Sequence, residues 1–579
     1  MLNSKWARIL LGVVAAAVVA LPGAVRAASP YAQWTNGPPS DPTYFPIGVW
    51  LQSTSSSRIV AYQAAGFNLY IGLWQGPTES QLSALKTRGM KVICAQNTVG
   101  LTSPNRNVIV GWMHQDEPDN AQDDGQGGYG PPVLPSVIVA GYNAMKAADP
   151  TRPVLLNLGQ GVAWDGYWGR GTRTNHPEDY PLYLQGCDIG SFDIYPYATT
   201  DTDPRYAPVN DKPYVIAGGV DRLVAWTNPE TQVRWSFVEC TNIHGYDEAT
   251  PAQVKAEVWM SLVHGSNGIL YFVHEFAPFI EAGLLADPVM TAAVTAINNE
   301  IRTLAPALNS ATVSGAATVT SSNPSVPVDL MVKHYGGQAY LFAVGMRDGT
   351  TTATFRLGGL PASATVEVIN ESRTITATNG TFQDTFSPYA VHLYRATLGP
   401  GPTIVSWQTV ASLGMAGVVS NEVVDGAVEP RLAGLRTLRI TFDKPLDPAT
   451  ITAGAVTIVG QTSGPVTVAT GDLGLSAGNM VLTIALPSAL ADADTYTVTV
   501  TGPVKGDGGV AAIGDLALTI KTLVGDVDGS GAVTAADILA ARAAAGPVNA
   551  ANARFDLNGS GAVTGDDLLA IRAIVRQQH

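Results

Sequence analysis

The stretch that decides the fold is residues 108–119, VIVGWMHQDEPD, where an apolar run of strand character stops at an acidic cluster and a proline. Val, Ile and Trp favour a strand, and Pro118 cannot donate to a strand ladder, so the strand ends before it. Residues 233–240, VRWSFVEC, end in the same way. Each run therefore places one glutamate, Glu117 or Glu239, where a strand stops.

Six further runs of strand character lie between residues 44 and 305, and helix-like segments follow most of the eight. The expected strands are Pro46 to Leu51, Phe67 to Leu73, Met90 to Ala95, Val108 to His114, Arg152 to Leu158, Asp188 to Tyr195, Val233 to Glu239 and Asn267 to His274. Eight such units in about 260 residues predict a (β/α)8 TIM barrel. Residues 96–107 show no clear helix, so an open doubly wound sheet is the alternative.

The rest of the chain is β-rich until its last segment. Short strands with a Gly336-Gly337 turn predict a β-sandwich over residues 306–397, and residues 398–402, LGPGP, form a linker. Residues 403–523 form a second β-sandwich, which resembles the Ig-like modules of exported bacterial enzymes. With the barrel at residues 29–305 and a small α-helical module at 524–579, we expect four domains.

Charge and targeting signals limit the function. The net charge of -14 argues against nucleic acid as a partner, because binding phosphates needs clustered Lys and Arg. Residues 1–28 have the layout of a signal peptide, so we expect a secreted protein. The apolar run from Ile9 to Leu21 is shorter than the ~20 residues of a membrane span, and no later segment is long enough. Cys94, Cys187 and Cys240 are expected to be buried thiols.

A 12-residue loop occurs twice near the C-terminus, at residues 526–537 and 556–567. Calcium needs six to eight oxygens, supplied from loop positions 1, 3, 5, 7 and 12, with glycine at position 6 for a sharp turn. The expected ligands are Asp526, Asp528, Ser530, the carbonyl of Ala532 and Asp537, and then Asp556, Asn558, Ser560, the carbonyl of Ala562 and Asp567. Two glycine-rich turns without metal are the alternative.

The two loops, each followed by a helix-like run, resemble a type I dockerin. This resemblance implies bound Ca²⁺ and a cohesin-bearing scaffold protein as partner. Ser530 and Ser560 replace the acidic residue usual at position 5, and the repeats are 30 residues apart, wider than is usual in the family.

In a TIM barrel the active site lies at the C-terminal ends of the strands. Glu117 ends the fourth expected strand and Glu239 the seventh, which resembles the retaining glycoside hydrolases of clan A. The resemblance implies that Glu117 is the acid/base and Glu239 the nucleophile, about 5 to 5.5 Å apart, acting without a cofactor. Asp116 stands where the clan usually has asparagine. Strand-end acids are also common as helix caps or solvated loop residues.

Aromatic and histidine side chains near strand ends are the expected sugar contacts, because sugar rings pack on aromatic faces. The substrate-binding candidates are Trp50, Trp74, His114, Asp116, Trp164, Trp168, Tyr195, Tyr271 and His274. Core packing is the competing explanation for the aromatic residues. The histidine spacing fits no zinc motif.

The sequence therefore predicts a secreted hydrolase of O-glycosidic bonds in a polysaccharide or oligosaccharide, attached to a scaffold or surface through its calcium-binding module. The rival from another class is a noncatalytic carbohydrate-binding or structural protein with a degenerate barrel. An inverting mechanism is a lesser rival.

Overall fold

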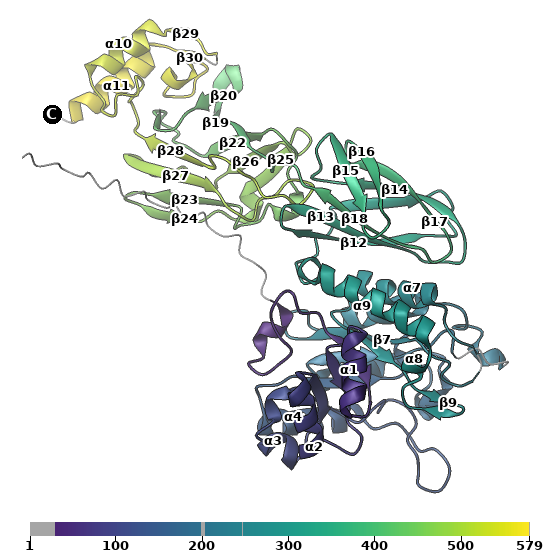
Figure 1. The fold of residues 1–579 in the computed structure, drawn as a ribbon. Helices are drawn as coiled ribbons and strands as arrows, with labels where there is room; N and C mark the ends of the chain where they lie inside the picture. The colour runs from purple at the N-terminus through teal and green to yellow at the C-terminus, as the bar shows by residue number, and fades with distance from the viewer. Residues whose placement is uncertain (1–28, 199–202, 246, 550, 578–579) are drawn as a thin grey trace, which may run out of the picture.

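The computed structural model describes residues 29–198, 203–245, 247–549 and 551–577, and the predicted signal peptide lies outside them. The molecule is elongated (Figure 1). A helix-covered barrel lies at one end, two β-modules follow, and a small pair of helices lies at the other end.

Eight parallel strands form the closed barrel. They are β1 (Ile47–Trp50), β2 (Leu69–Ile71), β3 (Lys91–Ala95), β4 (Ile109–Met113), β5 (Val154–Leu158), β6 (Ile189–Phe192), β7 (Val233–Glu239) and β8 (Ile269–Phe272). Val49 of β1 lies opposite Tyr70 of β2 and Tyr271 of β8, which closes the ring. The predicted TIM barrel is confirmed, and the open sheet is excluded.

Helices cover the outside of the barrel. They are α1 (Ser56–Ala64), α2 (Glu79–Arg88), α3 (Thr98–Thr102), α4 (Pro135–Ala148), α5 (Tyr180–Tyr183), α6 (Tyr214–Trp226), α7 (Pro251–Val263), α8 (Gly283–Ala286) and α9 (Pro288–Leu308). The segment without a predicted helix contains α3, which the Asn97 side chain caps by accepting from the Gly100 amide. Five residues are too few to show a helical period in the sequence.

Alternation along each strand divides the barrel residues into two cores. Val233, Trp235 and Phe237 of β7 point inward and pack with one another inside the barrel. Val238 points outward, into the core shared with α1, α2, α7 and α9. The N-terminal segment helps to close one end, because the Tyr31 hydroxyl donates to the Asn267 carbonyl (2.7 Å) and accepts from Trp235 Nε1 (2.9 Å).

The first β-module is an antiparallel sheet of eight strands in the order β11-β14-β17-β16-β15-β18-β13-β12. Its edge strands β11 and β12 contact each other, and its inner side chains form one core, as in a sandwich. The strands are β11 (Ala317–Ser321), β12 (Val328–Tyr335), β13 (Gln338–Gly345), β14 (Thr351–Leu357), β15 (Ser363–Val368), β16 (Arg373–Thr378), β17 (Thr381–Phe386) and β18 (Val391–Thr397). Trp259 of α7 packs on Phe342 of β13 (5.1 Å between ring centroids), which joins the sheet to the barrel.

The second β-module consists of two five-stranded sheets around one core. One sheet contains β19 (Ile404–Leu413), β20 (Gly417–Val423), β22 (Thr437–Phe442), β25 (Leu473–Ser476) and β26 (Val481–Ala485). The other contains β21 (Ala427–Glu429), β23 (Val456–Gly460), β24 (Gly464–Val466), β27 (Asp494–Val500) and β28 (Ala517–Thr522). The predicted β-sandwich is confirmed here.

The C-terminal module contains two helices, α10 (Ala535–Ala543) and α11 (Gly565–Gln577), and the short strands β29 (Gly546–Pro547) and β30 (Ala562–Val563). Val527, Leu557 and Ile571 are part of its small core. The three cysteines are free and buried, as predicted. Within the described ranges, no helix combines the length and apolar character that a membrane crossing requires.

Candidate active site and calcium loops

Glu117 follows β4 in a strained backbone conformation. Its φ is 41°, in the left-handed region that non-glycine residues rarely adopt and that is often found at functional sites. Gly159, just after β5, leaves the space for its carboxyl group, because a Cβ atom there would lie 2.8 Å from Glu117 Oε1. The carboxyl group therefore lies across the C-terminal end of β5.

Asp193 follows β6 and faces Glu117. Its amide donates to the Leu158 carbonyl (3.1 Å), which continues the ladder with β5. The carboxyl groups of Glu117 and Asp193 form a hydrogen bond with each other, and Asp193 also accepts one from the Tyr195 hydroxyl. Asp193 Oδ1 is buried and has no hydrogen-bond partner within the described part of the chain. Two carboxyl groups from different strand ends thus meet at the barrel mouth.

Asp116 is a third carboxyl group at the mouth. Asn157 of β5 donates from Nδ2 to Asp116 Oδ1 (2.9 Å) and accepts from the Ser191 hydroxyl of β6 (2.8 Å). Asp116 is exposed, yet enough protein surrounds its carboxyl group that desolvation raises its pKa to about 6, while the Asn157 hydrogen bond opposes this rise. The chain from Ser191 to Asp116 fixes the position of this carboxylate.

The environment of these carboxyl groups favours retention of a proton. Burial raises the pKa of Glu117 well above its ordinary value, and the charges of Asp193, Asp116 and Asp119 raise it further. Burial followed by the charge of Asp116 raises the pKa of Asp193 to about 7. Close carboxyl groups cannot easily both ionise, so the pair holds a proton more tightly than either group would alone.

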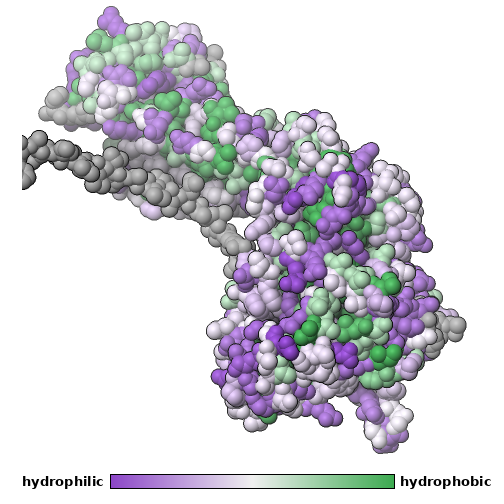
Figure 2. Space-filling model, in the orientation of Figure 1, coloured by the Kyte–Doolittle hydropathy of each residue, from purple (hydrophilic) through white to green (hydrophobic). Residues whose placement is uncertain are grey.

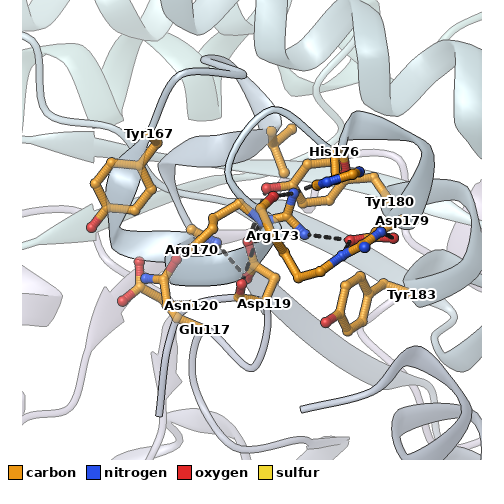
Figure 3. Close-up of polar contacts among 12 residues, drawn as sticks. Glu117, Asp119, Asn120, Tyr167, Arg170, Arg173, His176, Asp179, Tyr180 and Tyr183 are labelled. Carbon is orange, nitrogen blue, oxygen red and sulfur yellow. Dashed lines mark hydrogen bonds and ion pairs between the residues drawn. The ribbon is translucent and has the colours of Figure 1, made fainter. Parts of the chain in front are cut away.

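Asp119 connects the segments next to the site through buried hydrogen bonds. It is completely buried and accepts hydrogen bonds from the Gly159 amide (2.9 Å) and the Tyr180 hydroxyl (3.0 Å). Arg170 lies beside it and binds Asp179 (2.9 Å). In Figure 3, Glu117 and Tyr167 lie on one side of Arg170, and Asp179 lies on the other. This network joins the segment after β4 to the segment after β5.

An aromatic cluster lies in the segment after β5. Trp164 and Trp168 contact each other edge to face (5.4 Å), and Trp168 also packs on Tyr206 (4.6 Å) and under the Arg205 guanidinium (4.0 Å). Tyr167 packs on both tryptophans. Burial raises its pKa, and the charges of Glu117 and Asp193 raise it further, which indicates that Tyr167 lies near the carboxyl pair.

Trp74 is the most exposed of the predicted aromatic contacts. Its side chain is 43% exposed, donates from Nε1 to Glu281 Oε1 (2.8 Å) and stacks on His274 (6.0 Å, 11° between planes). His274 itself is buried, and its Nε2 lies 3.0 Å from the Leu51 carbonyl oxygen. Trp74 is therefore free to contact a ligand, whereas His274 is buried and stacks against the Trp74 ring.

The prediction that Glu239 is a nucleophile at the mouth does not agree with the structure. Glu239 is completely buried, and its carboxylate accepts the amides of Tyr197 (2.7 Å) and Ala198 (2.6 Å). It also lies close to the buried carboxyl group of Glu257 on α7, because the charge of Glu239 raises the pKa of Glu257. A carboxylate committed to backbone amides and without exposed surface cannot reach a sugar, so its role is structural.

Two further predicted contacts are wrong, because their side chains lie outside the barrel. His114 Nε2 lies 2.9 Å from the Gly186 carbonyl oxygen, behind β4. Tyr271 is completely buried in the outer core and packs on Phe67 (5.3 Å). Trp50 lies inside the barrel, 8% exposed, against Phe237 (5.6 Å). Tyr195 is at the mouth, where it contacts Asp193.

Asp193 is the main residue that the sequence reasoning missed. The expected strand ran from Asp188 to Tyr195, which placed Asp193 inside it, but β6 ends at Phe192. An acidic residue within an otherwise apolar run, FDIY, is the signal that could have revealed it. Asn157 and Ser191 were missed because polar residues inside strands have no motif of their own.

The first C-terminal loop brings three carboxylates together. Asp526, Asp528 and Asp537 each place an oxygen within 4.8 Å of the others, and Asp526 and Asp537 are completely buried. Gly531 has φ 90°, so the loop turns as position 6 of a calcium loop must. Among the described residues no ion pair neutralises these carboxylates. Ca²⁺ fits this donor set.

The second loop repeats the same pattern. The Ser560 amide donates to Asp556 Oδ1 (3.0 Å) and to Asn558 Oδ1 (2.9 Å), as the Ser530 amide does to Asp526 and Asp528 in the first loop. The Asp567 carboxylate accepts the Thr564 amide (2.8 Å), and the Ser560 hydroxyl donates to the Ala562 carbonyl (2.9 Å). The predicted ligands therefore converge in both loops.

Two families match parts of the chain. Residues 417–519 match the bacterial Ig-like domain, and residues 524–575 match the dockerin type I domain. The C-terminal resemblance predicted from the calcium loops is thus confirmed. No curated protein matches the chain.

Solved structures of glycoside hydrolases are similar at low identity. Alpha-galactosidase I from Mortierella vinacea has 12% identity and a TM-score of 0.38, covering 61% of this chain and 98% of its own. A GH30 endoxylanase from Clostridium papyrosolvens has 12% identity and a TM-score of 0.33, covering 61% and 96%. An alpha-amylase from Geobacillus thermoleovorans has 11% identity and a TM-score of 0.34, covering 61% and 98%.

Proposed function

We propose that the barrel hydrolyses O-glycosidic bonds in a polysaccharide or oligosaccharide, with Glu117 as proton donor and Asp193 as nucleophile. The observation that carries this proposal is the contact between these two carboxyl groups across the ends of β4 and β6. Glycoside hydrolysis needs one protonated and one ionised carboxyl group on either side of the scissile bond. Two neighbouring carboxyl groups that share one proton meet that need.

The reaction begins when protonated Glu117 gives its proton to the leaving oxygen while ionised Asp193 attacks the anomeric carbon. The bond to the leaving sugar breaks, and a glycosyl ester forms on Asp193. Water then attacks that ester, Glu117 accepts a proton from the water, and Asp193 leaves as carboxylate. We propose retention, because an inverting mechanism needs carboxyl groups roughly 6.5–9.5 Å apart with a water between them, and Glu117 and Asp193 are in contact.

The surrounding residues bind and orient the sugar. Trp74 offers an exposed ring face, and Asp116, held by Asn157, is placed to accept a hydrogen bond from a sugar hydroxyl. Trp164, Trp168 and Tyr195 complete the aromatic lining. The reaction uses no cofactor in this proposal.

The C-terminal module supports a location outside the cell. Its match to the dockerin type I domain favours secretion, bound Ca²⁺ and attachment to a cohesin-bearing scaffold. In this proposal the chain keeps the boundaries inferred from the sequence, with the catalytic domain at residues 29–305 and the dockerin-like domain at 524–579.

The test is hydrolysis by the purified protein on a polysaccharide panel, followed by Glu117→Gln and Asp193→Asn on the substrate found. Each variant should lose about 10²–10⁴-fold in kcat while still binding the polysaccharide. Asp123→Asn, an exposed acid in the same segment as Glu117, is the control and should keep full activity. A wild-type protein that binds a polysaccharide without releasing sugar would instead be a noncatalytic binding protein.

A further inference from the structure

The second calcium loop packs directly on the Ig-like module. A Cβ atom at Gly414, just after β19, would lie 2.1 Å from the Ser560 carbonyl oxygen. Gly559 touches the same segment, since a Cβ atom there would lie 3.8 Å from Leu413 Cδ2. The Leu432 amide donates to the Leu557 carbonyl (3.0 Å). The backbones of the two modules are therefore in direct contact at this junction, so a small shift of one module displaces the other.

The first calcium loop is also held by the Ig-like module. Lys521 of β28 donates from Nζ to the Gly531 carbonyl (2.9 Å), at the turn of the loop. Just before the loop, the amides of Leu523 and Gly525 donate to the carbonyls of Glu429 and Pro430 (3.1 and 2.9 Å). The chain thus enters the first loop as a continuation of the β-module, without a free linker.

A cavity of about 460 Å³ lies between the two modules. Ser412, Leu413 and Arg431 line one side, and Asp556 and Asn558, two expected ligands of the second calcium ion, line the other. Figure 1 shows β19 and β20 next to the paired strands β29 and β30, and in Figure 2 the two modules form one continuous body there.

We infer that the Ig-like module is part of the calcium-binding unit, because its docking holds both loops in the conformation that binds Ca²⁺. Position 5 is serine in both loops, and position 3 of the second loop is Asn558, so the second loop has only two carboxylates among its expected ligands. A site with few charges depends more on being preorganised. Docking and calcium binding are then linked, and each must strengthen the other by the same factor.

The test compares Gly414→Ala with Gly417→Ala in the full chain. Both glycines have positive φ (42° and 71°), so alanine is strained at both, but a Cβ atom at Gly417 meets nothing within 4 Å. After removal of divalent ions, calorimetric titration with CaCl₂ should show two sites in the wild type and in Gly417→Ala. Gly414→Ala should bind at the second site about fivefold more weakly or worse. Equal affinities in the two variants, or no calcium binding by the wild type, would overturn the inference.

A second measurement needs no substitution. Hydrogen exchange of the wild-type chain should show slower exchange of the Leu432 amide when Ca²⁺ is added, because this amide binds the Leu557 carbonyl. Exchange in β13 of the first β-module serves as the internal control and should not change. Exchange of Leu432 that ignores calcium would contradict the linkage even if Gly414→Ala fails to fold. Neither measurement depends on whether the barrel hydrolyses a sugar.

Discussion

Glu117 occupies a backbone conformation that most residues avoid, and the residues around it make this possible. Pro118 follows it, Asp119 is fixed by the Gly159 amide, and Gly159 itself leaves room for the carboxyl group. Strain of this kind is stable only where the surrounding structure imposes it. The position of the Glu117 carboxyl group therefore depends on the neighbouring residues Pro118, Asp119 and Gly159.

The space at Gly159 gives the first prediction. Gly159→Ala should lower kcat about tenfold or more, because the new Cβ atom would lie 2.8 Å from Glu117 Oε1 and displace it. Stability should change little, since φ is -83° there and alanine adopts it freely. Gly218→Ala on α6, where a Cβ atom meets nothing within 4 Å, is the control for kcat and Tm. Unchanged kcat in Gly159→Ala would separate Glu117 from catalysis.

The dependence of activity on pH gives the second prediction. Activity should rise as Asp193 ionises near pH 7 and fall at higher pH as Glu117 loses its proton. The charge of Asp116 raises both pKa values, so Asp116→Asn should move both limbs of the kcat/KM profile to lower pH. A profile that Asp116→Asn leaves in place would show that the charge of Asp116 does not act on Glu117 and Asp193.

The buried pair of Glu239 and Glu257 gives the third. Burial raises the pKa of Glu239 from 4.5 to about 7, so the folded state binds the proton more tightly than the unfolded state. This contribution to stability is complete below pH 4.5 and is lost as pH rises to about 7, on the order of 3 kcal/mol. Burial and then the charge of Glu239 raise the pKa of Glu257 as well, so Glu257 adds its own loss of stability as pH rises. Glu257→Gln should make the decline with pH smaller, because an amide binds no proton in either state. Equal declines in Tm from pH 5 to pH 8 in both proteins would contradict it.

At the scale of elements, the strand and helix alternation could be predicted because each unit carries its own period. Eight strands, including β4 and β7, were recognised from apolar runs and breakers. The end of β6 could not be predicted, because apolar residues continue on both sides of Asp193. The burial of Glu239 could not be predicted either, because it depends on the amides of Tyr197 and Ala198, which tertiary packing brings to it. Alternation along β7 alone would have pointed Glu239 inward.

The segments after β4 and β5 depend on one buried ion network, which gives the fourth prediction. Arg170 is 1% exposed and lies against Asp119 and Asp179. Arg170→Ala should lower the free energy of unfolding by about 3 kcal/mol or more, because it removes the cation beside completely buried Asp119 and the buried hydrogen bond to Asp179. Arg173→Ala, which also loses a contact with Asp179 but at a half-buried position where the side chain is 39% exposed, should cost about 1 kcal/mol or less. Denaturant titration compares the two, and equal costs would argue against the network.

At the scale of the whole molecule, the candidate active site and the calcium loops lie in different modules at opposite ends of the chain (Figure 1). The first β-module packs on α7 through Trp259, and the Ig-like module packs on the calcium loops. The first β-module also contacts the Ig-like module, because a Cβ atom at Gly508 would lie 2.0 Å from the Gly359 amide nitrogen. The modules therefore form one continuous series from the barrel to the calcium loops. This arrangement would let the proposed hydrolase act at the barrel end while the calcium module at the other end is attached.

The identity of the nucleophile is the sharpest test of the proposed mechanism. The full-length protein would be treated with an activated 2-fluoro glycoside of the sugar found on the panel, digested, and mapped by mass spectrometry for the glycosylated residue. We predict that the label is on Asp193. A label on Glu239 would contradict the account, because that carboxylate is completely buried in the structure described here.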